Sequence, residues 1–450
     1  EERYQFTTAL LAAREGIYLS YSTTDGENLT MRSNFIDAVC DAVATDTWGA
    51  ETFGASSLFA AAEAGKLIDQ GRFDEAVAII PLTAVHEATN RQNIEDYHRR
   101  GAWDSPYDCV LCDDHKTVAV LARRLGSDTI FSPTMFETYA SCPFRFYLKY
   151  VLSLDSPISP DPDLTARERG NLIHRIAHRF YTDWTQDECG PITETNHSKA
   201  LQRILTIGEE ETEEISLRST AWKVEKEFLL GSPLVGCGLL ERFIENELKL
   251  SASPLIPRAF EVSFGHSAGG EVVMTDAVPI KLGEGEDETI MLQGRIDRVD
   301  VAPDGTFMVI DYKTGRSWPG LADVMAGRAL QLPLYIRAVE ILTGLSGVAG
   351  AYYTIRQGEI RARPIFWDAD RLDHFAAYTR SRRNAVEDVR SLVDASLART
   401  REYLRDIKCG RFPPQREVGP CPGYCDFTTI CRFNELREFS APQEEIDEAY

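Results

Sequence analysis

Two short segments carry the residue types that phosphate chemistry requires. Residues 293–300 read QGRIDRVD and include Asp297, and residues 308–315 read MVIDYKTG and include Asp311 and Lys313. Residues two apart on a strand share a face, so Asp311 and Lys313 are predicted to project together. Converging carboxylates can hold Mg²⁺ or Mn²⁺, and an ammonium beside them can neutralise charge on a phosphoryl oxygen. The pattern predicts metal-dependent hydrolysis of a phosphodiester, with Lys313 kept protonated by its acidic neighbours.

The elements that must position these groups follow from the apolar periodicity. The Pro-Asp-Gly turn at 303–305 predicts that strands 291–301 and 306–312 form a hairpin, beside a strand at 259–264. A helix is predicted at 168–181, with His174 and His178 on the flank of its apolar stripe. Further along, we expect a helix at 321–342, a strand at 350–355 and a helix at 368–408. The fold class is therefore α/β.

The two acidic segments resemble the nuclease core of the RecB, AddB, Cas4 and Dna2 group of PD-(D/E)XK nucleases, and most closely the C-terminal part of the AddB family of ATP-dependent helicase–nuclease subunits. The resemblance implies a restriction-endonuclease-like core, a central mixed sheet flanked by helices. His174, in the G-x-x-x-H pattern that begins at Gly170, is implied as a metal ligand beside Asp297 and Asp311. The implied catalytic residues are Asp297, Asp311, Lys313, Gln331 and Tyr335, the last two from a Q-x-x-x-Y helix. His178 has no counterpart and is expected to be a packing or surface residue.

The first 45 residues carry a weaker resemblance. Residues 8–15, TALLAARE, followed by IYLSY at 17–21, resemble the last conserved motif of UvrD/RecB-type helicases. Ala12 stands where that motif has its arginine, and the sequence contains no G-x-x-x-x-G-K-[ST] loop, so we expect no nucleotide-binding residues and no ATPase activity. An ordinary amphipathic helix packed on a strand explains the same residues and stays open as the alternative.

Ten cysteines include one closely spaced set, Cys421, Cys425 and Cys431, whose thiolates can converge on one centre. In AddB and Cas4 relatives a lone cysteine before Pro-Phe joins three late ones around a [4Fe–4S] cluster, and Cys142 fits that position. The resemblance thus implies an iron–sulfur staple closed by Cys142, Cys421, Cys425 and Cys431. Zn²⁺ is the competing occupant of the same thiolates. The pair Cys109 and Cys112 is half of a zinc-ribbon spacing, and we interpret it as chance.

Composition limits the remaining possibilities. The 450 residues carry 48 Lys and Arg against 70 Asp and Glu, a net charge of −22, which argues against a protein that coats nucleic acid through bulk positive charge. Apolar runs are too short for a membrane span. The chain begins with Glu1 and lacks a basic start or an apolar h-region, so we expect a piece of a longer chain rather than a signal peptide.

We therefore divide the chain into the tail of a degenerate helicase-like domain (1–45), a helical connecting region (46–130), the nuclease domain (131–435) and an acidic tail (436–450). The expected function is a divalent-metal-dependent DNA exonuclease in double-strand-break repair and recombination. It would act in the cytoplasm at single-stranded or duplex DNA ends, beside a helicase–nuclease partner subunit. The alternatives are a non-catalytic DNA-end-binding scaffold subunit and a stand-alone single-strand exonuclease of the Cas4/Dna2 kind. Polarity and strand preference are not predicted.

Overall fold

The computed structural model describes most of the C-terminal three quarters of the chain. The described residues are 24–25, 28–29, 70–72, 74–75, 108–126, 129–155, 164–217, 219–265, 273–275, 277–282, 289–356, 358–414 and 425–431. The chain divides into two compact units, Glu1–Tyr97 and His98–Tyr450. In the first unit β1 (Thr24–Asp25) pairs antiparallel with β2 (Asn28–Leu29). The helicase-like motif around Ala12 lies outside the described residues.

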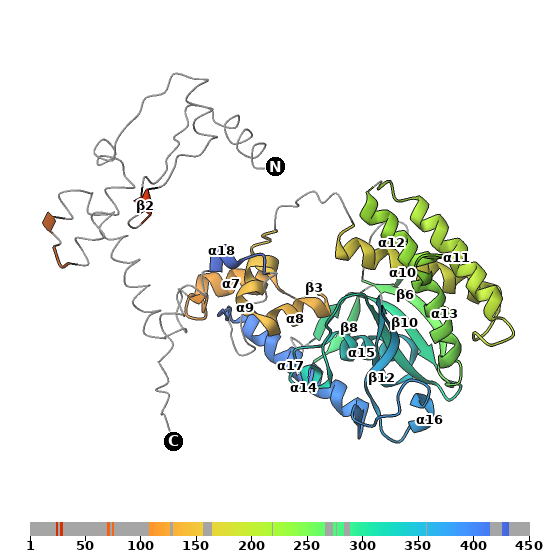
Figure 1. Ribbon diagram of the computed structural model, residues 1–450. Helices are drawn as coiled ribbons and strands as arrows, with labels where there is room; N and C mark the ends of the chain where they lie inside the picture. Colours follow the sequence, from red (N-terminus) through yellow and green to blue (C-terminus); the bar gives the residue numbers. More distant parts are fainter. Residues whose placement is uncertain are drawn as a thin grey trace, which may run out of the picture. The chain divides into compact units, whose positions relative to one another are not determined.

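A large mixed sheet forms the centre of the second unit (Figure 1). Its strands are β6 (Ile256–Phe264), β7 (Val273–Thr275), β10 (Gly294–Val301), β11 (Thr306–Lys313), β12 (Ser346–Arg356), β13 (Glu359–Asp368) and β14 (Ala385–Val386). The order is β14-β13-β12-β11-β10-β6-β7, with β11 parallel to β12 and β10 antiparallel to both neighbours. A smaller sheet contains β3 (Ile130–Phe131), β9 (Thr289–Leu292) and β8 (Val278–Lys281), and β4 (Gly231–Ser232) pairs with β5 (Gly236–Cys237).

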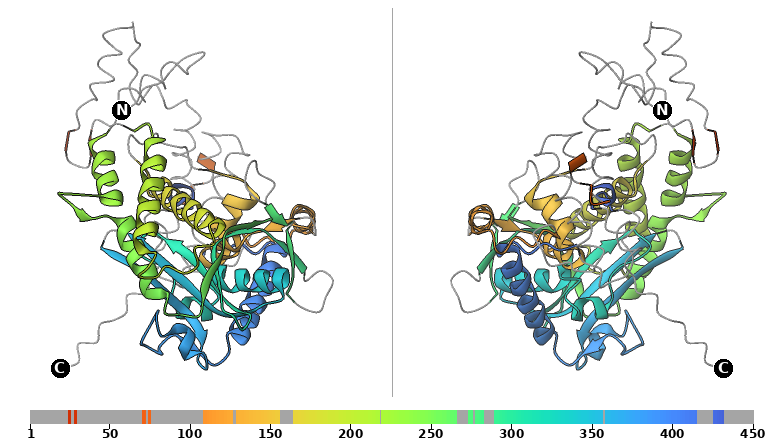
Figure 2. Two further views of the ribbon diagram at one scale, coloured as in Figure 1. Left: turned by 90° about the vertical axis from the view of Figure 1, so that its right-hand side faces the viewer. Right: turned by 90° about the vertical axis from the view of Figure 1, so that its left-hand side faces the viewer.

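Helices cover both faces of the large sheet (Figure 2). One face carries α10 (Ala166–Gln186), α11 (His197–Glu213), α12 (Thr220–Leu230), α13 (Leu239–Leu250) and α16 (Leu372–Phe375). The other face carries α8 (Pro133–Ser141), α9 (Pro143–Phe146), the π-helix η2 (Tyr147–Val151), α14 (Leu321–Met325), α15 (Gln331–Thr343) and α17 (Val389–Lys408), with α7 (His115–Arg124) beside them. The short α18 is Thr428–Cys431. The predicted α/β class, a mixed sheet flanked by helices, is confirmed.

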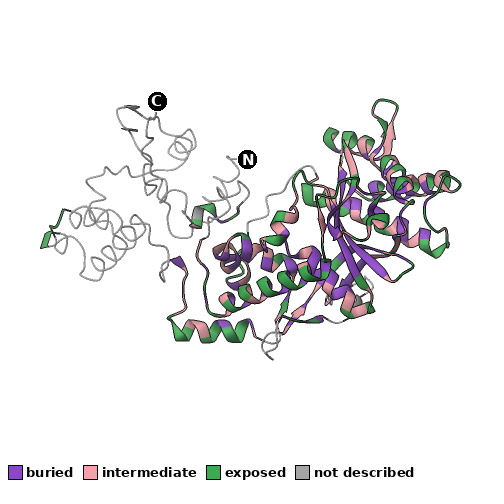
Figure 3. Cartoon of the chain, turned by 90° about the horizontal axis from the view of Figure 1, so that it is seen from below, coloured by how far each residue is buried: buried purple, intermediate pink, exposed green. Residues whose placement is uncertain are grey.

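Successive side chains of β11 point to opposite faces of the sheet and so belong to two separate hydrophobic cores. Phe307 and Val309 pack with the helices of one face, whereas Ile310 and Tyr312 pack with those of the other. The strands are therefore buried on both sides, as Figure 3 shows by their colour, and the exposed residues gather on the outer surfaces of the helices. The predicted hairpin is present, and Gly305 at its turn has a φ of 81°, which glycine adopts readily. The strand expected at 291–301 is divided, however, into β9 of the smaller sheet and β10 of the large sheet.

A buried ion network joins β10 to the helices of one face. Arg298, which is 1% exposed, donates to Asp300 Oδ1 at 2.6 Å and to Glu247 Oε2 on α13 at 2.9 Å. The hydroxyl of Tyr181 on α10 lies 2.9 Å from the same guanidinium and donates to Glu247. This network fixes the strand that carries Asp297 relative to the helix that carries His174.

Helix boundaries differ from the sequence prediction at two places. The helix expected at 321–342 is two helices, because Gly327 adopts a φ of 72° between α14 and α15. The helix expected at 368–408 begins only at Val389, where the Asp388 carboxylate caps it by accepting the N–H groups of Arg390 and Ser391.

Strand β13 was not predicted from the sequence. It contains Pro364, which has no N–H to donate and normally argues against a strand inside a sheet. The pairing register shifts at this place, between Gly350 and Ala351 of β12, and the irregularity accommodates the proline. No helix in the described part of the chain is long and apolar enough to cross a membrane.

Candidate active site

The two predicted aspartates lie at the end of the β10–β11 hairpin that is farther from its turn, where the two strands cease to pair. The ladder between β10 and β11 pairs Arg298 with Ile310 as its last regular step. Beyond this step the backbone N–H of Tyr312 donates to Asp297 Oδ2 at 2.7 Å. Asp297 and Asp311 therefore meet at the open end of the sheet, where they are 6% and 4% exposed.

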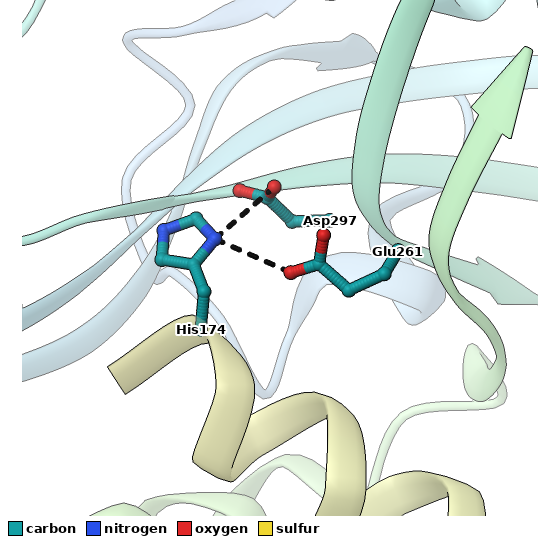
Figure 4. Close-up of side chains that lie close together, drawn as sticks. All are labelled: His174, Glu261 and Asp297. Atoms are coloured by element: carbon teal, nitrogen blue, oxygen red, sulfur yellow. Dashed lines mark hydrogen bonds and ion pairs between the residues drawn. The ribbon is translucent and has the colours of Figure 1, made fainter. Parts of the chain in front are cut away.

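Within the described residues, a histidine and two carboxylates form a group of side chains that could hold a metal ion. Donor atoms of His174, Glu261 and Asp297 all lie within 4.8 Å of one another. His174 Nδ1 is 3.3 Å from Glu261 Oε1 and 3.3 Å from Asp297 Oδ1 (Figure 4). The three side chains come from α10, β6 and β10, so the group depends on the packing of that helix against the sheet.

Glu261 was missed in the sequence interpretation. The register pairs Ile296 with Val262 and Arg298 with Phe260, which puts Glu261 opposite Asp297 on the neighbouring strand. Its φ of 46° lies in the left-handed region, a strained conformation for a non-glycine residue and one that recurs at functional sites. The signal in the sequence was an acidic residue within the apolar run of strand 259–264.

The charges in this group depend on one another. Burial and the nearby charge of Asp311 raise the pKa of Asp297, while the contact with His174 opposes the rise. Burial disfavours the imidazolium of His174, but its contacts with Asp297 and Glu261 are stronger and raise the pKa of His174 above its usual value. The raised pKa favours the imidazolium form of His174, and a cation bound by the carboxylates would compete with that proton.

Asp311 and Lys313 form a second, adjoining group with Gln331. Lys313 Nζ lies 2.5 Å from Asp311 Oδ2 and 3.3 Å from Gln331 Oε1. Gln331 Nε2, in turn, donates to Asp311 Oδ1 at 2.5 Å. Burial alone would lower the pKa of Lys313, but the charge of Asp311 and its hydrogen bond raise it, so the side chain is an ammonium.

Tyr335 lies one helical turn after Gln331 and reaches β10. Its hydroxyl accepts the backbone N–H of Arg295 at 3.4 Å. A Cβ added to Gly294 would lie 2.5 Å from a carbon of the Tyr335 ring and 2.9 Å from the Phe264 ring. Residue 294 must therefore be glycine for the tyrosine to pack there.

Gly170 and the two histidines of α10 differ in their surroundings. A Cβ at Gly170 would come within 3.3 Å of the Thr314 hydroxyl, just beyond the end of β11, so this glycine lets the helix approach the site. His178 is exposed. The structure brings His174 to the carboxylates and leaves His178 at the surface.

The donor set fits a hard divalent cation. His174, Glu261 and Asp297 offer one imidazole nitrogen and two carboxylate oxygens in a largely buried place, and carboxylate oxygens are the ligands that suit Mg²⁺ and Mn²⁺. Asp311 Oδ2 is buried and accepts no hydrogen bond of normal geometry besides its ion pair with Lys313. The predicted ligands were His174, Asp297 and Asp311. The group of ligand atoms in the structure contains Glu261 together with His174 and Asp297, whereas Asp311 is paired with Lys313.

Three of the four cysteines expected to bind a cluster are described. Cys142 connects α8 to α9, and its thiol accepts the backbone N–H of Arg145 at 3.4 Å. Cys425 lies three residues before α18, Cys431 is the last residue of that helix, and Cys421 lies outside the described residues. The iron–sulfur site remains a prediction.

The segment around α8 and α9 and the segment that follows α17 lie together. Tyr139 on α8 donates through its hydroxyl to the carbonyl of Arg411 at 2.7 Å, and the rings of Phe146 and Phe412 stack with centroids 6.1 Å apart. Val110 also forms an antiparallel bridge with Arg411. The chain that leads to Cys421 thus leaves from beside the helix that ends at Cys142.

Relatives of known type match the same region. The B subunit of the ATP-dependent helicase/deoxyribonuclease of Symbiobacterium thermophilum is 30% identical over 250 residues, 52% of this chain and 20% of that protein. The protein of the same name from Acetivibrio thermocellus is 23% identical over 380 residues, 75% of this chain and 30% of the relative. The chain therefore spans less than a third of the length of these curated relatives.

The sequence profile of the PD-(D/E)XK nuclease superfamily matches residues 130–432, well over half of the chain. The matched region contains the mixed sheet, the acidic hairpin, the lysine two residues after Asp311, and the helix with Gln331. The chain belongs to the PD-(D/E)XK nuclease superfamily.

Proposed function

We propose that this chain is a divalent-metal-dependent DNA nuclease that hydrolyses phosphodiester bonds. The observation that carries the proposal is the meeting of two groups at the open end of the hairpin. His174, Glu261 and Asp297 provide metal ligands, and the ion pair of Asp311 and Lys313 adjoins them. A phosphodiester placed between the groups would face a cation site on one side and an ammonium on the other.

Each residue has a role that its contacts support. A bound Mg²⁺ or Mn²⁺ supplies Lewis-acid polarisation of the phosphoryl oxygen. Lys313 remains charged beside Asp311, so it can offset the negative charge that develops on the phosphate. Gln331 contacts both Asp311 and Lys313 and keeps them in one geometry, while Tyr335 fixes α15 against β10.

The relatives extend the proposal to the whole protein. They are named subunits of an ATP-dependent helicase/deoxyribonuclease. We propose that this chain is likewise the nuclease part of such a subunit, which degrades DNA ends as an exonuclease beside a helicase partner in the cytoplasm. Processing of double-strand breaks for recombination is the corresponding role.

We also propose that Cys142, Cys421, Cys425 and Cys431 hold a [4Fe–4S] cluster. The contact of Tyr139 with Arg411 supports it, because it holds the two ends of the nuclease region together near Cys142. A cluster there would restrict the unfolded chain over a very long loop, which stabilises the folded state. Zn²⁺ at the same thiolates is the alternative.

Cleavage of end-labelled DNA tests the nuclease proposal. Single-stranded and duplex DNA, labelled at the 5′ or 3′ end, would be incubated with the chain purified without oxygen and with Mg²⁺, Mn²⁺ or EDTA. We expect metal-dependent cleavage, and a loss of at least about a hundredfold in Lys313→Ala. Lys249→Ala, a change at an exposed lysine of α13, is the control. Absence of cleavage by the folded wild type would indicate a DNA-end-binding subunit instead.

A further inference from the structure

Glu137 caps the helix that carries Gln331. The first N–H groups of a helix have no partner within it, and the residue that precedes α15, Leu330, has no side chain that can accept them. Glu137 lies almost two hundred residues earlier, on α8. Its Oε1 accepts the backbone N–H groups of Leu330 and Gln331, each at 2.8 Å.

The position of this carboxylate is unusual for a simple helix cap. Burial raises the pKa of Glu137, and the two N–H groups and the charge of Lys313 partly offset the rise. An exposed serine or aspartate nearby in sequence would cap α15 at lower cost. A glutamate recruited from a separate helix instead fixes the distance between α8 and α15.

Gln331 is the residue that this contact fixes. Its backbone N–H is held by Glu137, while its side chain donates to Asp311 Oδ1 at 2.5 Å and accepts from Lys313 Nζ at 3.3 Å. One residue therefore joins the cap to both members of the ion pair. We propose that Glu137 is a positioning residue of the active site, which sets the geometry of Asp311 and Lys313 through Gln331. The inference rests on the nuclease function proposed above.

The same helix, α8, leads directly to Cys142, one of the proposed cluster ligands. α8 ends at Ser141, and the backbone N–H of Cys142 donates to the carbonyl of Thr138 at 2.9 Å. Glu137 and Cys142 thus belong to one short, continuous element. A displacement of Cys142 would move Glu137, and with it the start of α15.

Two variants separate the acceptor oxygen from the volume of the side chain. Glu137→Gln keeps an oxygen that accepts the two N–H groups, whereas Glu137→Leu fills the space without one. Asp114→Ala is the matched control, because it removes a carboxylate that caps a different helix, α7. The measured quantities are kcat and KM for DNA cleavage, the Kd for Mn²⁺ and the Tm.

We expect Glu137→Leu to lower kcat by about 10- to 100-fold, because a small displacement of catalytic groups has effects of this size. KM and the Kd for Mn²⁺ should change by less than about threefold, because Glu137 is hydrogen-bonded to Leu330 and Gln331 and not to the proposed ligands His174, Glu261 and Asp297. Glu137→Gln should retain kcat within about fivefold of the wild type. Asp114→Ala should retain kcat even where its Tm falls.

Three results would overturn the inference. They are wild-type kcat in Glu137→Leu, an equal loss of kcat in Glu137→Gln and Glu137→Leu, and a loss of Mn²⁺ binding in parallel with kcat, which would indicate a general structural role. Failure of the wild type itself to cleave DNA with Mg²⁺ or Mn²⁺ would contradict the nuclease function, so the two failures are distinguishable.

Discussion

Three carboxylates of the site, those of Glu261, Asp297 and Asp311, are each less than one-tenth exposed. Their repulsion is balanced by the ammonium of Lys313, by the guanidinium of Arg295 beside Glu261, and by His174, whose pKa the contacts with Asp297 and Glu261 raise. Burying this much like charge is unfavourable for folding, and a divalent cation relieves the repulsion. This concentration of buried acidic groups supports the proposal that the site binds a divalent metal.

Glu261→Gln tests the ligand that the sequence interpretation missed. The amide keeps the shape but removes a negative charge and an anionic oxygen, so Mn²⁺ affinity should fall by at least about tenfold. Isothermal titration calorimetry with Mn²⁺ measures it, and Glu209→Gln, at an exposed residue of α11, is the control. Unchanged affinity in Glu261→Gln would exclude this carboxylate from the metal site.

Gly294→Ala tests the close packing of Tyr335. The added methyl would overlap the rings of Tyr335 and Phe264, and overpacking of this kind costs about 1–3 kcal/mol. We expect a lower free energy of unfolding in urea together with weaker DNA cleavage. Gly315→Ala is the control, because its nearest neighbouring atom would be 4.0 Å away. Equal stability of the two variants would show that Tyr335 tolerates the methyl.

At the scale of elements, β10 connects the chemistry to the scaffold. Its side chains Asp297 and Arg298 serve different purposes: the first belongs to the metal-ligand group and the second to the ion network with Asp300 and Glu247. The position of Asp297 depends on the position of β10. The ion network of Arg298 therefore positions the site in addition to filling the core.

Arg298→Met should destabilise the fold strongly. It removes the cation and leaves the carboxylates of Asp300 and Glu247 buried without it, which costs about 3–5 kcal/mol. Urea unfolding measures the loss, and Arg258→Met, at an exposed position of β6, is the control. A loss no larger than that of the control would mean that the network contributes little to stability.

The sequence predicted the elements whose signals are local. Alternation and a Pro-Asp-Gly turn were enough for the hairpin of β10 and β11, and an apolar stripe was enough for α10. The break at Gly327 and strand β13 could not be read in the same way, because a glycine interrupts many helices without ending them and Pro364 normally argues against a strand. Tertiary contacts determined both the helix break at Gly327 and the formation of strand β13.

The residues of the candidate site, too, were predictable where their signals are local in the sequence. Asp297, Asp311 and Lys313 are close in sequence and were named from their spacing and family resemblance, as were His174 and Gln331. Glu261 and Glu137 act through register and helix packing across long sequence separations, which one sequence does not encode locally. The assignment of individual roles remains a prediction that the experiments above test.

At the scale of the whole molecule, the nuclease region is closed on itself. Tyr139 and Phe146 near its start contact Arg411 and Phe412 near its end. The proposed iron–sulfur cluster would strengthen a junction that packing already forms. Its removal should loosen the junction first and affect the metal-ligand group, on other elements, only indirectly.

Cys425→Ser tests the cluster. The variant purified without oxygen should lose iron and sulfide and show a Tm lowered by several degrees, since about 2–4 kcal/mol is typical of a long covalent constraint. Mn²⁺ affinity should remain close to that of the wild type. Elemental analysis and thermal unfolding measure these effects. Zinc without iron in the wild type would show that these cysteines form a zinc site and not an iron–sulfur cluster. Unchanged metal content in Cys425→Ser would exclude Cys425 as a ligand.

The most direct test of the central claim uses Asp297→Asn, a nearly isosteric change in the residue that joins the hairpin to the metal-ligand group. Mn²⁺ binding and metal-dependent cleavage of labelled DNA would be measured on the same preparations of wild type and variant. We expect both to fall together, cleavage by at least about a hundredfold, while the Tm stays near that of the wild type. Wild-type cleavage by Asp297→Asn would contradict the account, because the site described here would then not be where DNA is cut.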